Sequence, residues 1–188
     1  MDTSLLDKAI VFAVKAHAGV ERKGKGFPYI VHPLEAVAIA ATMTNDQELL
    51  AAAALHDTVE DTSVTFRDIE REFGKRVAEL VDAESDVEFA GKTREQSWRL
   101  RKEEAINRLS TAENDVKIVA LADKLSNVRA IYRDHQAIGD EVWNLFCVKD
   151  KASHEWHFRG LVRALKSLES TFAYKEFAET VDKVFGRS

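Results

Sequence analysis

The sequence has few of the residues that break helices or cross-link a chain. Its 188 residues include one cysteine, two prolines and eight glycines. The single cysteine, Cys147, cannot form an intramolecular disulfide, so a disulfide framework is excluded. Because proline occurs only at positions 28 and 33, most of the chain is free of the residue that interrupts helices. The chain must therefore owe its stability to an ordinary hydrophobic core.

Three further features are missing. The most apolar stretch, residues 49–55, is far too short to span a bilayer, and the N-terminus lacks the basic start and apolar run of a signal peptide. The net charge of -5 argues against binding to a nucleic acid polymer, although a local basic pocket is compatible with it. The chain has no P-loop motif for nucleoside triphosphates. We therefore expect a cytoplasmic protein that neither enters a membrane nor binds nucleic acids.

The composition and the spacing of apolar residues indicate the fold class. Hydrophobic residues make up 45% and charged residues 31% of the chain, as in globular proteins, and the length suits a single domain over residues 1–188. Apolar residues recur every three to four positions, which is typical of amphipathic helices. The sequence therefore predicts an all-α, irregular helical bundle of about eight or nine helices.

Local signals predict where several helices begin and end. Pro33 suits the first turn of a helix, where its missing N–H has no partner to lose. Asn45 is expected to cap the next helix, which runs to about Asp57 and is followed by a turn over residues 58–63. Thr65 and Asp68 have the spacing of a capping box. Further helices are expected over about 75–86, 92–110, 115–132, 153–169 and 174–185, while 138–147 shows a weaker pattern.

The adjacent pair His56-Asp57 offers one nitrogen and one oxygen ligand to a divalent metal. Glu60 follows three residues after Asp57 and would share a helical face with the pair if the helix continues. Together with Asp61 this gives a cluster of acids, which repel each other unless a cation compensates. The alternative is purely structural, with a histidine at a helix end beside a capping acid.

Two other segments carry candidate ligands. His32 precedes Pro33 at the expected start of a helix, and Asp123 lies among apolar residues in a later helix. Asn127 follows Asp123 by four residues, so both side chains project from one helical face and could meet the same ligand. Taken singly, His32 could equally be a packed histidine, and Asp123 could pair with a lysine or arginine.

Together these segments resemble the HD-domain superfamily and, within it, the small alarmone hydrolases related to the hydrolase half of the RelA/SpoT proteins. The resemblance spans about residues 3–132. It implies a His/His/Asp/Asp metal site, usually loaded with manganese, whose ligands are His32, His56, Asp57 and Asp123. The segments that carry it are Arg22-Lys23, His32-Pro33, His56 to Thr62, and Leu121 to Arg129.

The resemblance also implies a reaction and a substrate. It implies removal of the 3′-pyrophosphate from guanosine tetra- or pentaphosphate, with Glu60 and Asp61 placing or deprotonating the attacking water. The expected substrate-binding residues are Arg22 against the base, Lys23 near phosphate, Asn127 near the nucleoside, and Arg129. Two alternatives remain: a phosphohydrolase for the adenosine counterpart or another nucleotide, and a catalytically idle nucleotide-binding domain. A homo-oligomer is compatible with the sequence.

The chain departs from this family pattern at Ala120, where many relatives carry a lysine. If that lysine helps to hold phosphate, positive charge must come from elsewhere, and Lys92, Arg94, Arg99 and Arg101 are candidates. The alternative for the basic segment 91–102 is the solvated face of an amphipathic helix. His17 is expected to pack near a helix end, and His135, His154 and His157 to be ordinary surface or core residues. Trp143, Trp156 and Phe158 are expected to build the C-terminal core or a subunit contact rather than a platform for stacking a base.

Overall fold

A computed structural model describes residues 2–87 and 89–187, which form helices and no strand; the nearest approach to a sheet is an isolated bridge between Glu21 and Pro28. The prediction of an all-α bundle is confirmed. The helices are α1 (Ser4–Ala16), α2 (Val31–Ala40), α3 (Gln47–Leu55), α4 (Thr58–Asp61), α5 (Phe66–Phe73), α6 (Lys75–Glu84), α7 (Arg94–Thr111), α8 (Asn114–Ile138), α9 (Lys151–Ala164) and α10 (Phe172–Phe185), with 3-10 helices η1 (Gly139–Leu145) and η2 (Lys166–Leu168).

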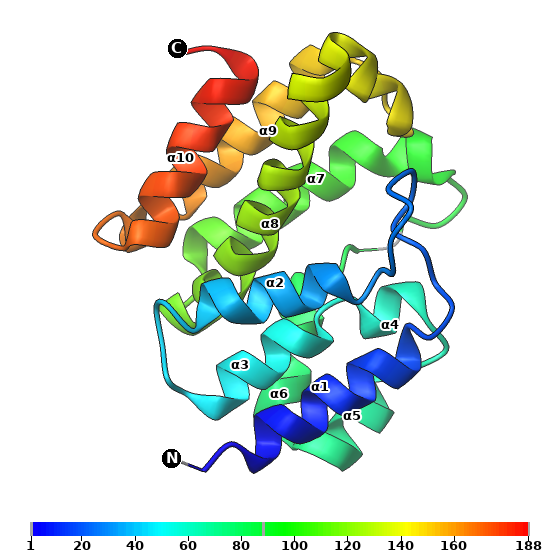
Figure 1. Cartoon of the computed structure of the whole chain (residues 1–188), viewed down its shortest axis with the longest axis vertical. Coiled ribbons are helices and arrows are strands. Elements are labelled where there is room, and N and C mark those ends of the chain that lie inside the picture. Colours follow the sequence, from blue (N-terminus) through cyan, green and yellow to red (C-terminus); the bar gives the residue numbers. More distant parts are fainter. Residues whose placement is uncertain (1, 88, 188) are drawn as a thin grey trace.

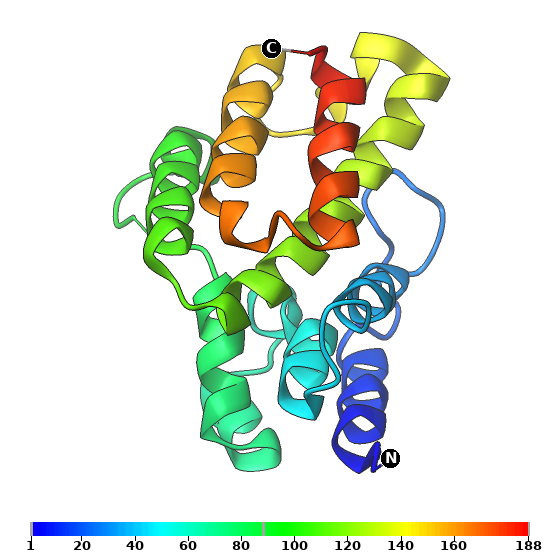
Figure 2. The ribbon, with the colours of Figure 1, turned by 90° about the vertical axis from the view of Figure 1, so that its left-hand side faces the viewer.

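The helices are arranged in two groups along the long axis of the molecule. Helices α1 to α6 form one end, and α7, α9 and α10 form the other, with the two termini at opposite ends (Figures 1 and 2). Helix α8 joins the groups, because it packs against α2, α3 and α6 as well as against α10 and η1. One long helix thus belongs to both halves of the core.

Helix α3 is the centre of the first group. It packs against α1, α2, α6 and α8, and every residue from Leu49 to Leu55 is buried. A helix that is apolar on all sides must be surrounded by other elements, which explains why this segment shows no polar face. The helix directs His56, at its C-terminal end, into the middle of the protein.

Most predicted helix boundaries agree with the structure, with four differences, one of which is that α9 ends at Ala164, where the predicted helix ran to 169, and the separate 3-10 helix η2 follows. The capping box of Thr65 and Asp68 is formed. The third helix is capped by Asp46 and not by Asn45, because the Asp46 carboxylate accepts the Glu48 N–H at 2.9 Å. Residues 58–61 form the short helix α4 where a turn was predicted, and α8 continues to Ile138, six residues beyond the expected end.

The basic loop between α1 and α2 is held by its own backbone. The Arg22 N–H donates to the Phe27 carbonyl at 3.0 Å, and the Lys25 N–H donates to the Arg22 carbonyl at 2.9 Å. Gly24 and Gly26 have φ values of 71° and 69°, which glycine adopts without strain. From this tight loop the Arg22 side chain reaches α8, where it donates to Asn127 at 2.8 Å.

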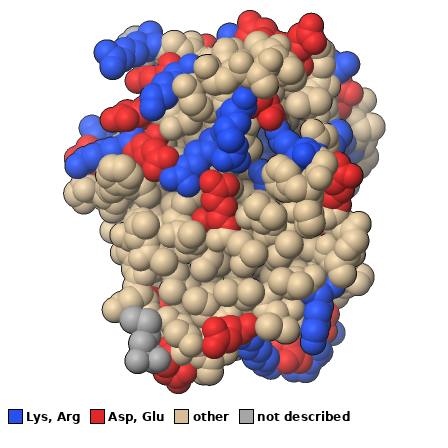
Figure 3. Space-filling model, viewed as in Figure 1, with Lys and Arg blue, Asp and Glu red and all other residues tan. Residues whose placement is uncertain are grey.

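Charged side chains are unevenly distributed over the surface. On the face shown in Figure 3, lysine and arginine gather at the α8 to α10 end, whereas the belt over α2 and α3 carries few charges. Among the described residues, no helix is both long and apolar enough to cross a membrane.

Candidate active site

Three helices bring four polar side chains to one point in the interior. His32 comes from the first turn of α2, His56 and Asp57 follow α3, and Asp123 lies in the middle of α8. The His32 Nε2 atom lies 3.3 Å from Asp57 Oδ2 and 3.0 Å from Asp123 Oδ1. The His56 Nε2 atom lies 3.0 Å and 3.5 Å from the same two oxygens, and 3.2 Å from His32 Nε2.

Hydrogen bonds on the far side of each imidazole fix its orientation. The His56 Nδ1 atom lies 2.9 Å from the Ala53 carbonyl, which can only accept, so Nδ1 carries the proton. The Ser126 hydroxyl donates to Glu35 at 2.8 Å and therefore accepts from His32 Nδ1, also at 2.8 Å. With Nδ1 protonated in both rings, a neutral imidazole turns the Nε2 lone pair toward the two carboxylates.

Two lone pairs and two carboxylates that face one another require a positive charge between them. Burial opposes the charge of His56, but Asp57 and Asp123 outweigh it and hold the pKa of His56 well above its ordinary value. Likewise, despite burial, the two histidines hold the pKa of Asp57 well below the usual range, and Lys124 with the two histidines does the same for Asp123. A proton can supply the missing charge, and so can a metal ion.

The spacing of these atoms fits a divalent metal. With bonds of about 2.1 Å, neighbouring ligands lie about 3.0 Å apart in an octahedron and about 3.4 Å apart in a tetrahedron. The observed separations of 3.0 to 3.5 Å lie at these values. The ligand atoms of His32, His56 and Asp57 all lie within 4.8 Å of one another. The described residues therefore include a His/Asp group that could hold a divalent metal.

Three residues beside this group were not identified from the sequence: Tyr29, Lys124 and Glu84. The Tyr29 hydroxyl donates to Asp57 Oδ2 at 2.6 Å, and burial together with the charges of Asp57 and Asp61 raises the pKa of Tyr29. Lys124 contacts Asp123 and lies 3.3 Å from Glu84 Oε2. Burial opposes the charge of Lys124, yet these two acids hold its pKa well above the ordinary value. Tyr29 lies three residues before His32 and Lys124 directly follows Asp123, so their closeness in sequence was an available signal.

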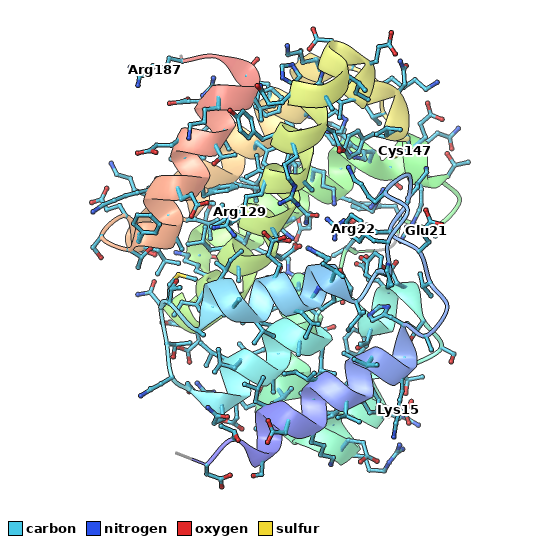
Figure 4. All side chains as sticks on the ribbon, viewed as in Figure 1. Lys15, Glu21, Arg22, Arg129, Cys147 and Arg187 are labelled. Carbon is cyan, nitrogen blue, oxygen red and sulfur yellow. The ribbon has the colours of Figure 1, made fainter. Side chains whose placement is uncertain are left out.

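A chain of polar contacts leads from His32 to the C-terminal helix. Glu35, which accepts from Ser126, also lies 3.1 Å from Arg129 Nη1. Arg129 in turn donates twice to Glu176 of α10, at 2.7 Å each. Figure 4 shows Arg129 on the α10 side of α8 and Arg22 on the opposite side. The structure therefore pairs Arg129 with two acids and does not bring it into the cavity described below.

The predicted catalytic acids lie in α4, directly after the His56-Asp57 pair. The Glu60 Oε1 atom accepts the Asp86 N–H at 2.5 Å. Desolvation of its carboxyl group, together with the charges of Asp86 and Asp57, raises the pKa of Glu60, although the residue as a whole is exposed. Asp61 is exposed and lies close enough to Tyr29 to affect its hydroxyl. Both acids are therefore next to the ligand group, and Glu60 is held by a backbone hydrogen bond.

A cavity of about 370 Å³ opens beside the ligand group. Tyr29, Lys124 and Asn127 line it and also contact the Asp57 or Asp123 carboxylates. Arg22 lines it as well and donates to the Asn127 side chain at 2.8 Å. The volume is within the range of small-molecule sites, roughly 300 to 1,000 Å³. A ligand in this cavity would therefore lie against the His/Asp group and the basic loop.

The cations of the cavity agree only in part with those expected from the sequence: Arg22 and Lys23 line it, whereas Lys92, Arg94, Arg99 and Arg101 do not. Lys23, Lys102 and Arg108 line it, whereas Arg99 stacks on the Trp156 ring at 3.2 Å outside it. Arg101 pairs with Asp86, which also lies 3.0 Å from the Lys102 amine. Position 120 is fully buried in the core, so an alanine there fits its surroundings. The positive charge near the site therefore comes from the basic loop, from α8 and from α7.

Several aromatic residues also line the cavity, and three of them, His154, His157 and Phe158, were expected to have ordinary roles. Trp98 of α7, Phe146 after η1, and three residues of α9 form part of its wall. Their sequence gives no sign of this, because α9 reaches the cavity only through its packing on α7. The α9 residues that line the cavity are His154, His157 and Phe158.

This helical fold with a buried His/Asp group defines a class of protein. The family model of the HD domain matches residues 9–148, and the chain belongs to this family. It is 37% identical over 128 residues to the guanosine-3′,5′-bis(diphosphate) 3′-pyrophosphohydrolase of Aquifex aeolicus, covering 68% of this chain and 18% of that protein. It is also 37% identical over 131 residues to the bifunctional (p)ppGpp synthase/hydrolase SpoT of Escherichia coli, covering 67% and 18%.

These curated relatives are much longer proteins, since the chain spans less than a fifth of their length. A solved structure of similar size is that of a metazoan ortholog of SpoT that hydrolyzes ppGpp. It superposes with a TM-score of 0.74 and covers 97% of this chain and 96% of its own, at 23% identity. The superposition shows that both chains share the whole helical fold.

Proposed function

We propose that this chain is a metal-dependent phosphohydrolase that removes the 3′-pyrophosphate of an alarmone nucleotide, (p)ppGpp or its adenosine counterpart. The observation that carries the proposal is the convergence of two imidazole lone pairs and two carboxylates beside a cavity with basic walls. Such a group fits a divalent cation, and such a cavity fits a phosphorylated small molecule. The names of the relatives support the choice of substrate.

The proposed ligands are His32, His56, Asp57 and Asp123, and the proposed metal is manganese. Mixed nitrogen and carboxylate ligands accept several divalent ions, so the choice of manganese rests on the family resemblance. When bound, the metal would polarise a phosphoryl oxygen and lower the pKa of water.

Glu60 and Asp61 are the proposed catalytic acids. Partial desolvation raises the pKa of Glu60 and brings it closer to neutral pH, which favours proton transfer at working pH. The Asp86 N–H holds one oxygen of Glu60, so the carboxyl group has a fixed orientation. Asp61 stands next to it with an exposed side chain, suited to exchange a proton with solvent.

The proposed substrate-binding residues are Arg22, Lys23, Asn127 and Arg129. The first three line the cavity, and Arg22 and Asn127 are already hydrogen-bonded to each other. The ion pairs of Arg129 with Glu35 and Glu176 favour a positioning role for this residue over direct contact with the substrate. Arg129 then acts by holding Glu35 and, through Ser126, His32.

The proposal is tested with a panel of 3′-pyrophosphorylated and ordinary nucleotides incubated with manganese-loaded protein, with products separated by chromatography. We expect pyrophosphate to be released from guanosine or adenosine 3′-pyrophosphates only. Asp57→Ala and Asp123→Ala should lose bound metal and turnover together, because each removes a ligand and a negative charge. An equal rate on ordinary 5′-nucleotides would point to a general nucleotide phosphohydrolase. Metal binding and nucleotide binding without turnover would point to an idle binding domain. A cytoplasmic location stays a prediction.

A further inference from the structure

The Asp57 side chain is not held by its own helix. Asp57 stands at the N-terminal end of α4, where a carboxylate often caps a helix, but it makes no capping hydrogen bond. Apart from the two histidines, the partner of its carboxylate among residues 2–87 and 89–187 is the Tyr29 hydroxyl, which donates to Oδ2 at 2.6 Å. The same Oδ2 atom lies 3.0 Å from His56 Nε2 and 3.3 Å from His32 Nε2. Tyr29 therefore holds the carboxylate oxygen that faces the histidines.

This hydrogen bond is compatible with metal binding at the same oxygen. A carboxylate oxygen has two lone pairs, so it can accept from a hydroxyl and still offer a lone pair to a cation. Carboxylates that bind metals are commonly held in this way by an outer hydrogen bond, which fixes the direction of the ligand. The Tyr29 hydroxyl stands in that position relative to Asp57.

Tyr29 is itself fixed by its backbone and by its ring. Its N–H donates to the Val20 carbonyl at 2.9 Å, which closes the base of the basic loop. The His17 ring lies 4.9 Å from the Tyr29 ring, with 34° between the two planes, and the Arg22 guanidinium lies 5.9 Å from the ring centre. His17 is 2% exposed, and neither of its nitrogens has a hydrogen-bond partner among the described residues. His17 therefore supports Tyr29 with its ring and not through a hydrogen bond.

A direct contact between the Tyr29 hydroxyl and the substrate is the alternative, because Tyr29 also lines the cavity. A tyrosine hydroxyl has one proton to donate, and that of Tyr29 is directed at Asp57. Ionised phosphate oxygens only accept hydrogen bonds, so the hydroxyl cannot donate to them while it holds Asp57. The geometry favours a role through Asp57.

We propose that Tyr29 is a positioning residue of the metal site: its hydroxyl directs Asp57 Oδ2 toward the cation, and the His17 ring holds Tyr29 in place. This inference rests on the proposed function, since it takes Asp57 as a metal ligand. It gives the basic loop two tasks. The loop carries Arg22 to the cavity and ends in the tyrosine that orients a metal ligand.

The first test is Tyr29→Phe, which removes the hydroxyl and keeps the ring. The affinity of the full chain for manganese, measured against a competing chelator, should fall about 10- to 100-fold. Tyr174→Phe is the matched control, because Tyr174 is also half-buried and its hydroxyl donates to the Val162 carbonyl at 3.0 Å, away from the cavity. The control should bind manganese like the parent. Parental affinity in Tyr29→Phe, or equal weakening in both variants, would overturn the proposal.

The second test concerns the support from His17. His17→Ala leaves the Tyr29 ring without its neighbour and should weaken manganese binding, by less than Tyr29→Phe does. His17→Phe restores an aromatic ring and should restore the affinity, since the histidine nitrogens make no described hydrogen bond. Parental affinity in His17→Ala, or equal weakening in His17→Ala and His17→Phe, would overturn the role of His17. Thermal unfolding without metal shows whether each variant is folded, and Tyr29→Phe decides the main proposal if His17→Ala does not fold.

A third measurement separates positioning of the metal ligand from direct participation in the reaction. If Tyr29 acts by holding Asp57 for the metal, added manganese compensates for the lost hydroxyl. At saturating manganese, Tyr29→Phe should therefore hydrolyse the 3′-pyrophosphorylated nucleotide with kcat and KM near the parental values. A loss of kcat that persists when the metal site is full would overturn the positioning role.

The proposed reaction and this inference can fail separately. If the chain hydrolyses no alarmone but Tyr29→Phe still weakens manganese binding, the reaction is wrong and the role of Tyr29 stands. If alarmone hydrolysis proceeds and Tyr29→Phe binds manganese like the parent, the reaction stands and the role of Tyr29 is wrong. A parent chain that binds no manganese would overturn both.

Discussion

The Ser126 hydroxyl connects His32 to the rest of the protein, and its removal is the sharpest test of the metal site. Ser126 is 1% exposed, accepts from His32 Nδ1 and donates to Glu35. Ser126→Ala leaves both partners without this bond in the interior. The imidazole then loses the contact that fixes its tautomer and its direction toward Asp123.

The size of the effect follows from these contacts. Loss of a partner that orients a ligating histidine lowers metal affinity by about 10- to 100-fold, or about 1.4 to 2.7 kcal/mol. The unpaired buried groups should also cost the metal-free protein about 1 to 3 kcal/mol of unfolding free energy. For a chain of this length that lowers Tm by roughly 2–4 °C per kcal/mol.

Manganese affinity is measured by titration in competition with a chelator, and stability by thermal unfolding without metal. Ser97→Ala is the matched control, since Ser97 is a buried helical serine whose hydroxyl donates to the Thr93 carbonyl at 2.8 Å. It should lose stability and keep its metal affinity. The reasoning is refuted if Ser126→Ala binds manganese as tightly as the parent, or if both variants weaken metal binding equally.

Three further predictions address the acids, the basic loop and pH. Glu60→Gln should keep its metal and lose at least ~10²-fold in kcat, because shape is retained and basicity is lost; parental kcat with metal bound would exclude Glu60 from catalysis. Arg22→Ala should raise KM for the 3′-pyrophosphorylated nucleotide more than Lys23→Ala does, with metal content unchanged in both; parental KM and kcat in both variants would mean that these cations only solubilise the loop. The third prediction concerns pH, because the pKa of His56 in the folded protein lies above the ordinary 6.5. The proton on His56 therefore stabilises the metal-free protein fully below about pH 6.5, and this stabilisation is lost as pH rises through the folded-state pKa. Since metal replaces that proton, the gain in Tm on adding manganese should grow as pH rises over this range; a constant gain would contradict the assignment of His56 as a ligand.

Local features of the fold could be predicted from the sequence because they depend on neighbours along the chain. The capping box at Thr65 depends only on Asp68, three positions later. The fit of Pro33 depends only on the first helical turn, which contains it. The single-residue error at Asn45 arose because Asp46 follows it directly, and both are good capping residues. The predicted end of α8 was too early, because no helix-stop signal occurs before Gly139, whose φ of 61° ends the helix.

The site could be predicted in part, and the limit is equally physical. The four proposed ligands lie in short segments whose residue types already suggest metal binding. The role of Ser126 and Glu35 could not be inferred, because serine and glutamate are common on helices and their pairing depends on α2 packing against α8. The same holds for His157, which looks like any core histidine until α7 and α9 bring it to the cavity.

These long-range contacts also bear on domain organisation. The segments that carry the family resemblance end near residue 132, yet α9 contributes to the cavity wall and Glu176 of α10 holds Arg129. Helix α8 carries Asp123 for the metal group, Asn127 for the cavity and Arg129 for the contact with α10. A domain boundary placed after α8 would separate the His/Asp group from the C-terminal helices that complete its surroundings. We therefore propose that residues 1–188 act as one domain, in which the C-terminal helices shape the substrate cavity while the N-terminal helices and α8 hold the metal.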